Sequence, residues 1–548
     1  MEICKNINMS VFGCANKSRF VQFISTLTYW HISTFILLFF TSCDQFLDTL
    51  PDNRTSIDTQ QKISQLLVAA YPDANYAVLA ELSSDNFVDN NAILPVKLAP
   101  FERMHDEIFS WSDVTSSTQQ DSPSYVWERC YAAIATANQA LKAIKELEET
   151  DPKIDLATQK GEALLCRAYS HFILVNIFSH TYKDEIASKN DKGIPYITEP
   201  ETKVSVQYIR ESVQSVYAKI QQDLEDGLSL ITNQNLVVPK YHFNKQAAAA
   251  FAARFYLYKR DYPNVVKYAN QALSANPATI LRDWSINYDN SDAITYDYIS
   301  KDNACNFMIL PTSSLFGRIY GTRYGHNGEA MYGSTYGPGP TWTNSLPCFD
   351  GKLYIVGQQD YGVFFPKASE MFEYTDKVAG IGYTHIVRAE FTAEETLLCR
   401  AEALVYLNRI SEAVNDLQMW NQSHLAPKAL TESLIQNFYR STDSIFVNPL
   451  NNRMISQSFA ISSNQLPFIH CVLHFRRIET MFDGYRWFDI KRYGIEIERK
   501  IAGKGTDILK YDDPRRAIQL PQEVITAGME ANARKSTPVS TGSYKKWK

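Results

Sequence analysis

The sequence predicts a mostly α-helical protein with one large loop-rich insertion. Apolar residues recur at helical spacing through much of the N-terminal third of the chain. Two tight helix–turn–helix pairs follow, one on each side of the insertion. The insertion, residues 281–390, is rich in Gly, Pro, Asn and Tyr and has no long helical stripe. The chain has 548 residues, which is enough for one large domain or several smaller ones.

The first 42 residues differ from the rest and resemble an export signal. Lys17 and Arg19 precede an uncharged stretch that runs from Phe20 to Ser42, and Cys43 follows directly. Small residues that end on a cysteine are typical of a bacterial lipoprotein, so we expect Cys43 to carry a lipid. The alternatives are an uncleaved signal anchor and a transmembrane helix, since a span needs about 20 residues. Several polar residues in the upstream half of the stretch disfavour both alternatives.

After this signal the periodicity predicts the helices one by one. They are residues 62–70, 125–147, 155–178 and 207–231, then the pairs 244–258 with 262–273 and 393–406 with 410–420. The two pairs have similar spacing, and each carries an arginine in its first helix, Arg254 or Arg400. Repeated hairpins with small residues at their contacts resemble tetratricopeptide units. Because the repeats are not contiguous, we expect a helical scaffold with an insertion and not a simple solenoid.

This pattern divides the chain into four regions. Residues 1–42 form the signal, 43–280 an N-terminal helical region, 281–390 the aromatic insertion and 391–548 a C-terminal region.

The insertion holds the candidate ligand-binding residues. From Trp284 to Trp342 there are 11 aromatic residues in 59 positions, a higher share than the 13% of the whole chain. Loops on a rigid scaffold often carry binding residues, and flat rings with polar neighbours suit a sugar. The candidates are Tyr320, Arg323, Tyr324, Asn327, Tyr332, Tyr336 and Trp342. The alternative is that these rings pack the loop onto the helices.

Composition and motifs weigh against a nucleic-acid-binding protein, several common enzyme families and a metal-binding protein. The formal net charge is −6, whereas a nucleic-acid-binding protein needs a basic face. We find no nucleophile elbow, zinc-protease motif, phosphate loop or dinucleotide-binding turn, and so expect no cofactor. The nearest approach to a metal cluster is His105 with Asp106 and Glu107, or His326 near Glu329, and we expect no metal site there.

Six cysteines remain beyond the predicted lipid site, which is sparse for an exported protein. Cys130, Cys166 and Cys399 fall among apolar residues on helix-like segments, so we expect buried thiols. The sequence has no C-x-x-C pair.

A set of short motifs, in a fixed order behind the predicted lipid site, resembles a known family. They are CDQFLD at 43–48, ELSSDN at 81–86, the W-x3-Y-x2-I-x3-N helix from Trp127, GEALLCRAY at 161–169, GIP at 193–195, the helical E-x3-L-x2-A-E-A segment within 392–407 and RRIETMFDGYRWFDIKRYG at 476–494. Together they resemble the SusD/RagB family. In the last motif Asp483 replaces the usual glutamate. We also expect a structural role for this motif, with Arg486 or Arg492 paired to Asp489 or Glu479.

The resemblance implies a SusD-like fold with four tetratricopeptide-like helical hairpins and an irregular ligand-binding half. It implies a lipid-anchored, surface-exposed outer-membrane protein that is not an enzyme. Such a protein would bind oligosaccharide and deliver it to a SusC-like TonB-dependent transporter. A peptide-binding RagB-like role, a glycan-degrading enzyme with two carboxylates and a pure protein scaffold remain as alternatives.

Overall fold

The structure, a computed structural model, describes residues 57–201, 206–234, 236–333, 335, 337–357, 359–440 and 459–534. The predicted signal, Cys43 and Tyr336 lie outside the described residues. From Asp58 onward the described chain belongs to one compact unit. None of the helices in the described ranges is both long and apolar enough to span a bilayer.

The described residues form 17 α-helices, which confirms the mostly helical fold class. They are α2 (Gln60–Leu67), α3 (Ala77–Ser83), α4 (Asn90–Ile93), α5 (Arg103–Phe109), α6 (Pro123–Thr150), α7 (Ala157–Phe178), α8 (Val213–Leu230), α9 (Lys245–Lys259), α10 (Tyr262–Ala272), α11 (Ser291–Tyr298), α12 (Gly328–Tyr332), α13 (Ala393–Tyr406), α14 (Ile410–Ser423), α15 (Glu432–Arg440), α16 (Leu466–Glu479), α17 (Tyr485–Tyr493) and α18 (Gln522–Thr526).

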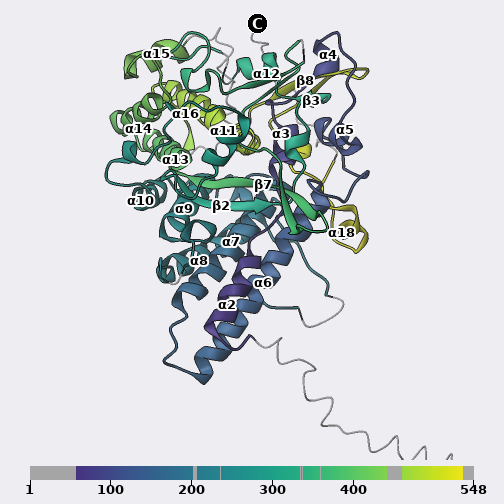
Figure 1. Ribbon diagram of the computed structural model, residues 1–548, viewed down its shortest axis with the longest axis vertical. Coiled ribbons are helices and arrows are strands. Elements are labelled where there is room, and N and C mark those ends of the chain that lie inside the picture. Colours follow the sequence, from purple (N-terminus) through teal and green to yellow (C-terminus); the bar gives the residue numbers. More distant parts are fainter. Residues whose placement is uncertain are drawn as a thin grey trace, which may run out of the picture. The chain divides into compact units, whose positions relative to one another are not determined.

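Short strands accompany the helices. They are β1 (Val88–Asp89), β2 (Asn306–Thr312), β3 (Tyr324–Gly325), β4 (Tyr354–Val356), β5 (Gly362–Phe364), β6 (Met371–Asp376), β7 (Ile381–Thr392), β8 (Ile497–Ile501) and β9 (Gly505–Leu509). All their pairings are antiparallel: β1 with β3, β4 with β5, β8 with β9, and β7 with both β2 and β6. The C-terminal half of β7 pairs with β2, which lies beside it in Figure 1. The N-terminal half of β7 pairs with β6.

The predicted helices agree with the structure within a few residues, with one exception. The helix predicted to begin at residue 207 begins at Val213, so the predicted start was wrong. The Ser212 hydroxyl caps this helix by accepting a hydrogen bond from the Ser215 amide at 3.1 Å. Before it, the Gly193 amide donates to the Glu211 carbonyl at 2.6 Å, which keeps that stretch extended.

Both predicted helical hairpins are present. In the first, Arg260 adopts a left-handed φ of 66° between α9 and α10. In the second, Asn408 does the same between α13 and α14, with a φ of 58°. Helix α10 packs against α13, so the two hairpins are neighbours in space although the insertion separates them in sequence. The number of four tetratricopeptide-like hairpins stays a prediction, as does the division into regions.

Helices α7 and α8 approach each other closely at two glycines. A Cβ on Gly161 would lie 3.0 Å from the Gly227 carbonyl oxygen, and a Cβ on Gly227 would lie 3.0 Å from the Gly161 carbonyl oxygen. Gly161 opens the GEALLCRAY motif, so this contact explains why a glycine stands inside a helix there.

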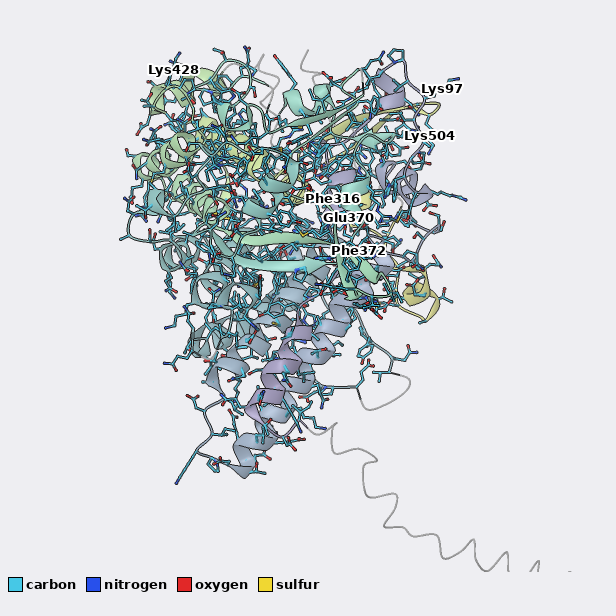
Figure 2. All side chains as sticks on the ribbon, in the orientation of Figure 1. Lys97, Phe316, Glu370, Phe372, Lys428 and Lys504 are labelled. Carbon is cyan, nitrogen blue, oxygen red and sulfur yellow. The ribbon has the colours of Figure 1, made fainter. Side chains whose placement is uncertain are left out.

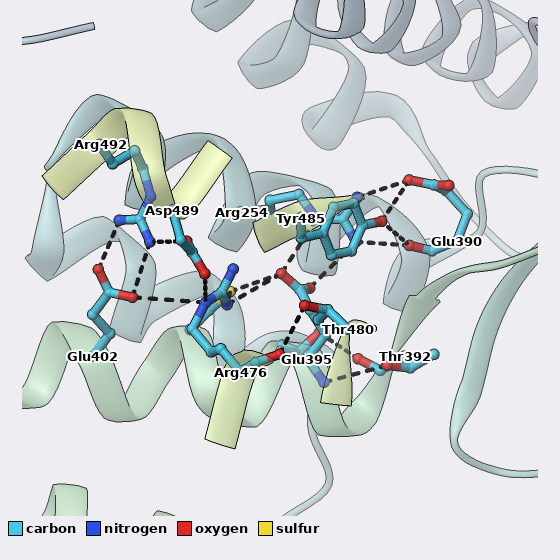
Figure 3. A network of polar contacts seen from close by, with 12 residues as sticks. Arg254, Glu390, Thr392, Glu395, Glu402, Arg476, Thr480, Tyr485, Asp489 and Arg492 are labelled. Carbon is cyan, nitrogen blue, oxygen red and sulfur yellow. Dashed lines mark hydrogen bonds and ion pairs between the residues drawn. The ribbon is translucent and has the colours of Figure 1, made fainter. Parts of the chain in front are cut away.

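A buried network of ion pairs joins α9 of the N-terminal region to β7, α13 and α17 (Figure 3). The Arg254 guanidinium on α9 donates to the Glu390 carboxylate on β7 at 2.8 Å. The Arg492 guanidinium on α17 donates to the Glu402 carboxylate on α13 at 2.7 Å. Since all four side chains are buried and paired, the network fixes how these elements meet more than it adds stability.

The late motif has the structural role expected of it. Arg492 pairs with Asp489 at 2.6 Å, as predicted. Arg486 instead pairs with Asp85 of the early ELSSDN motif, and Glu479 accepts a hydrogen bond from the Trp420 indole at 2.8 Å. The prediction that Arg486 or Arg492 pairs with Asp489 or Glu479 is therefore confirmed, by the pair of Arg492 with Asp489.

The cysteines among the described residues are buried and unpaired. This confirms the expectation of buried thiols for Cys130, Cys166 and Cys399. Burial raises the pKa of the Cys130 thiol well above its usual range, which makes it a poor nucleophile.

Candidate functional site

The predicted ligand segment is fastened to the N-terminal region by a two-residue strand pair. Tyr324 pairs with Asp89 and Gly325 with Val88, which joins β3 to β1. The pairing of β3 with β1 therefore connects the insertion directly to the N-terminal region.

Arg323 forms the polar centre of this attachment. Its Nε and Nη2 atoms donate to the two carboxylate oxygens of Asp89 at 3.0 and 2.7 Å, and its Nη1 atom donates to Asp106 at 3.2 Å. Hydrogen bonding to Asp89 raises the pKa of Arg323. Asp89 is buried, whereas Arg323 and Asp106 are partly exposed, so part of this ion-pair cluster reaches the surface.

Tyr324 and Asn327 are both buried. Tyr324 is 2% exposed, stacks on Phe109 with ring centroids 4.3 Å apart, and donates its hydroxyl to Asp106. The side-chain Oδ1 atom of Asn327 accepts from the Ala330 amide at 3.0 Å, which caps α12. Its amide group donates to Asn90 at 2.9 Å. Both side chains hold the segment in place in this conformation.

Tyr320 and Trp342 pack against other elements. The Tyr320 ring stacks on Phe364 of β5 with centroids 4.4 Å apart, and burial raises the pKa of its hydroxyl. The Trp342 indole donates to the Gly337 carbonyl at 3.0 Å, and its ring lies 5.8 Å from that of Phe475 on α16.

Tyr332, at the end of α12, differs from the other described tyrosines of the set because its side chain is 45% exposed. Tyr336 lies outside the described residues. The structure thus brings Arg323, Tyr324 and Asn327 into one attachment and places Tyr320 and Trp342 on separate contacts. As an assignment of ligand contacts, the whole set stays a prediction.

Other exposed rings lie outside the predicted segment, on the β6–β7 hairpin. Phe372, Tyr374 and Tyr383 are each about half exposed. Phe372, labelled in Figure 2, contacts Tyr374 edge-on at 4.9 Å between ring centroids. The alternation of Phe372 and Tyr374 along one strand is the sequence signal for this surface, and the window that ended at Trp342 missed it.

The histidines considered for a metal site have other partners. His105 is buried, and this desolvation lowers its pKa to about 4. Its neighbours diverge, because Asp106 binds Arg323 and Glu107 binds Ser116. Burial also lowers the pKa of His326, whose Nε2 atom lies 3.2 Å from Glu81. Within the described ranges, no three His, Cys, Asp or Glu side chains converge as metal ligands would.

Two family models match the chain in succession. One, described as "Starch-binding associating with outer membrane", matches residues 45–257. The other, described as "SusD family", matches residues 354–539. The chain belongs to the SusD family. The earlier resemblance, drawn from short motifs, is thereby confirmed.

Relatives and solved structures agree with this assignment. A SusD-like protein of Formosa agariphila is 21% identical over 518 residues, covering 83% of this chain and 89% of the relative. A SusD superfamily protein of Bacteroides vulgatus superposes with a TM-score of 0.62 at 16% identity, covering 87% of this chain and 99% of that one. A SusD-like carbohydrate binding protein of the same organism gives a TM-score of 0.51 at 17% identity and covers 83% and 89%. These structures establish that the SusD fold is shared.

Proposed function

We propose that this protein is a cell-surface lipoprotein that binds a nutrient oligosaccharide and passes it to a SusC-like TonB-dependent transporter. The observation that carries the proposal is membership of the SusD family, supported over residues 45–257 and 354–539. One family model is described as starch-binding, and a solved structure of similar fold is described as carbohydrate binding. A lipid on Cys43 would hold the protein at the outer membrane.

The geometry of residues 323–332 supports sugar binding. An exposed ring at Tyr332 can stack on the apolar face of a sugar, while the partly exposed Arg323 and Asp106 can bind hydroxyl groups. The attachments through Asp89 and Asn90 fix this segment before a ligand arrives, which lowers the entropy lost on binding.

The protein binds and does not cleave in this proposal. Arg323 forms ion pairs with both Asp89 and Asp106, so neither carboxylate is placed as the protonated general acid that a glycosidase needs.

Affinity electrophoresis of the purified chain through gels with different polysaccharides tests the proposal. At least one polysaccharide should retard the protein. In that gel Tyr332→Ala should weaken binding about two- to tenfold, because one stacking contact is worth about 0.5–1.5 kcal/mol. Tyr296→Ala is the matched control, since Tyr296 is also exposed but lies on α11. Equal retardation of both variants would refute the assignment of Tyr332.

A second experiment tests the partner. The native chain, extracted from its membrane in mild detergent, should co-purify with a large outer-membrane barrel. Recovery of the chain alone would contradict delivery to a transporter. Retention of short peptides but of no polysaccharide would favour the RagB-like alternative.

A further inference from the structure

A second concave site lies where α6, the segment 195–201, residues 206–208 and the α18 region meet. Its volume is about 350 Å³, and none of its lining residues belongs to the segment 320–342. We propose that this pocket binds a small apolar ligand that carries a positive charge, such as an aliphatic or aromatic amine. This site is separate from the proposed oligosaccharide site and does not depend on it.

Two aromatic rings on α6 form one wall of the pocket. Trp127 and Tyr131 lie one helical turn apart, with ring centroids 4.9 Å from each other. The Trp127 ring also contacts Phe178 edge-on at 5.1 Å, and the Tyr131 hydroxyl donates to the Pro195 carbonyl at 2.8 Å. Because each ring has a second contact, the wall is fixed without a ligand.

A second part of the lining is the backbone segment 195–201, which hydrogen bonds from α6 and α7 hold in place. The amide of Asn138 donates to the Ile197 carbonyl at 3.2 Å, and the Ile197 amide donates to His171 at 3.1 Å. The Arg167 guanidinium donates to the Thr198 carbonyl at 3.1 Å. Arg167 is in turn held by both carboxylate oxygens of Asp223 at 2.7 Å.

The pocket is therefore preformed, and its volume falls within the range of about 300–1,000 Å³ that is usual for small-molecule sites. Its uncharged lining is mainly aliphatic, from Ile134, Ala135, Val206, Val524, Ala527 and Met529, with Gln207 as a polar exception. A sugar needs hydrogen-bond partners around its whole rim, so this lining suits an apolar body better.

The charged side chains in the lining favour one sign of ligand charge over the other. Among the described lining residues the carboxylates come from Glu199 and Glu201, and none of these described residues is a lysine or an arginine. The faces of Trp127 and Tyr131 also attract cations. The nearby Arg210 lies outside the lining and donates to the carbonyls of Gly193 and Glu530 at 2.7 and 2.9 Å. A cation is favoured and an anion disfavoured.

Glu201 also accepts a hydrogen bond from the hydroxyl of Tyr208. The carboxylate keeps further acceptor positions for an ammonium group.

Three probes of similar size test the proposal by titration calorimetry and saturation-transfer NMR: phenethylamine, 2-phenylethanol and phenylacetate. The amine should bind about tenfold more tightly than the alcohol, which corresponds to about 1.4 kcal/mol, and phenylacetate should be weakest. Equal binding of all three probes, or no binding of the amine, would overturn the proposal.

Variants locate the binding. Ala135→Phe should fill the pocket and abolish amine binding, whereas Ala132→Phe, at another exposed position of α6 outside the lining, should leave it unchanged. The double variant Glu199→Gln with Glu201→Gln should lower amine binding to the level of the alcohol, and Glu128→Gln on α6 should not. Amine binding that survives Ala135→Phe in a folded protein, shown by an unchanged circular dichroism spectrum, would contradict the site.

Discussion

Asp85 and Arg486 lie 401 positions apart in the chain and form a bidentate ion pair. The Arg486 Nε atom donates to Oδ1 of Asp85 at 2.8 Å, and its Nη2 atom donates to Oδ2 at 2.7 Å. Arg477 also donates to the Asp85 carbonyl at 3.0 Å. The early ELSSDN motif and the late motif therefore contact each other directly in the fold.

Asp85→Asn should destabilise the protein by about 2–4 kcal/mol, because it leaves the buried Arg486 and the partly buried Arg477 without their carboxylate. Burial raises the pKa of Asp85, but Arg477 and Arg486 outweigh that effect and hold it below its usual range. A carboxylate with a lowered pKa stabilises the fold above its unfolded pKa of about 4 and loses this contribution as the pH falls. Urea unfolding at pH 7 and at pH 3.5 should show the difference shrinking in acid.

Asp58→Asn is the control for that variant. Asp58 pairs with Lys62 at 2.7 Å on the exposed start of α2, so its loss should change stability by about 0.5 kcal/mol or less. If both variants lowered the free energy of unfolding by the same amount, the contact between the two motifs would contribute no more stability than an exposed ion pair.

Gly161→Ala should destabilise the protein by about 1 kcal/mol or more. Helix propensity alone predicts the opposite sign, a gain of about 1 kcal/mol. The new methyl group would lie 2.9 Å from the Ile231 amide nitrogen, so α7 and α8 must move apart. A higher melting temperature for Gly161→Ala would refute the close packing of these helices.

Asp121→Asn should stabilise the protein above about pH 7. Burial raises the pKa of Asp121 to about 7, and one of its carboxylate oxygens has no hydrogen-bond partner among the described residues. Since the folded state holds this proton more tightly than the unfolded state, wild-type stability falls as the pH rises from about 4 to 7. Asparagine tolerates the left-handed φ of 64° at this position.

Urea unfolding at pH 5 and pH 8 measures this effect. Wild type should lose between about 1 and 4 kcal/mol relative to Asp121→Asn over this interval. The prediction fails if the stability difference between the two proteins is the same at both pH values.

Tyr324→Ala should lower the stability of the fold, because Tyr324 is a packing residue. The buried ring stacks on Phe109, so its removal should cost about 3–5 kcal/mol in the free energy of unfolding. Tyr332→Ala, at an exposed ring, should change stability by about 0.5 kcal/mol or less. Chemical denaturation of both variants distinguishes a packing residue from a surface residue, and similar losses of stability would contradict this assignment.

The helices could be predicted from the sequence because their signal is local. The stripe from Val126 to Ile144 and the turn at residues 259–261 needed no knowledge of distant partners. The start of α8 was misplaced because the bond between Gly193 and Glu211 depends on a segment that comes earlier in the chain.

The site was harder to predict because exposure depends on distant contacts. Tyr324 and Tyr332 stand in the same loop-like stretch, yet one is covered by Phe109 and the other is half exposed. The pocket beside α6 depends on the positions of Pro195 and Met529, far from Trp127 in sequence. Residue type alone cannot separate a ring that packs from a ring that binds.

The most direct test of the central claim is titration calorimetry of the purified chain with oligosaccharides released from a polysaccharide that retards it. The account predicts saturable binding of a sugar that is recovered at its original length after prolonged incubation. Shortened products, or heats that match those of buffer for every sugar in the panel, would contradict it.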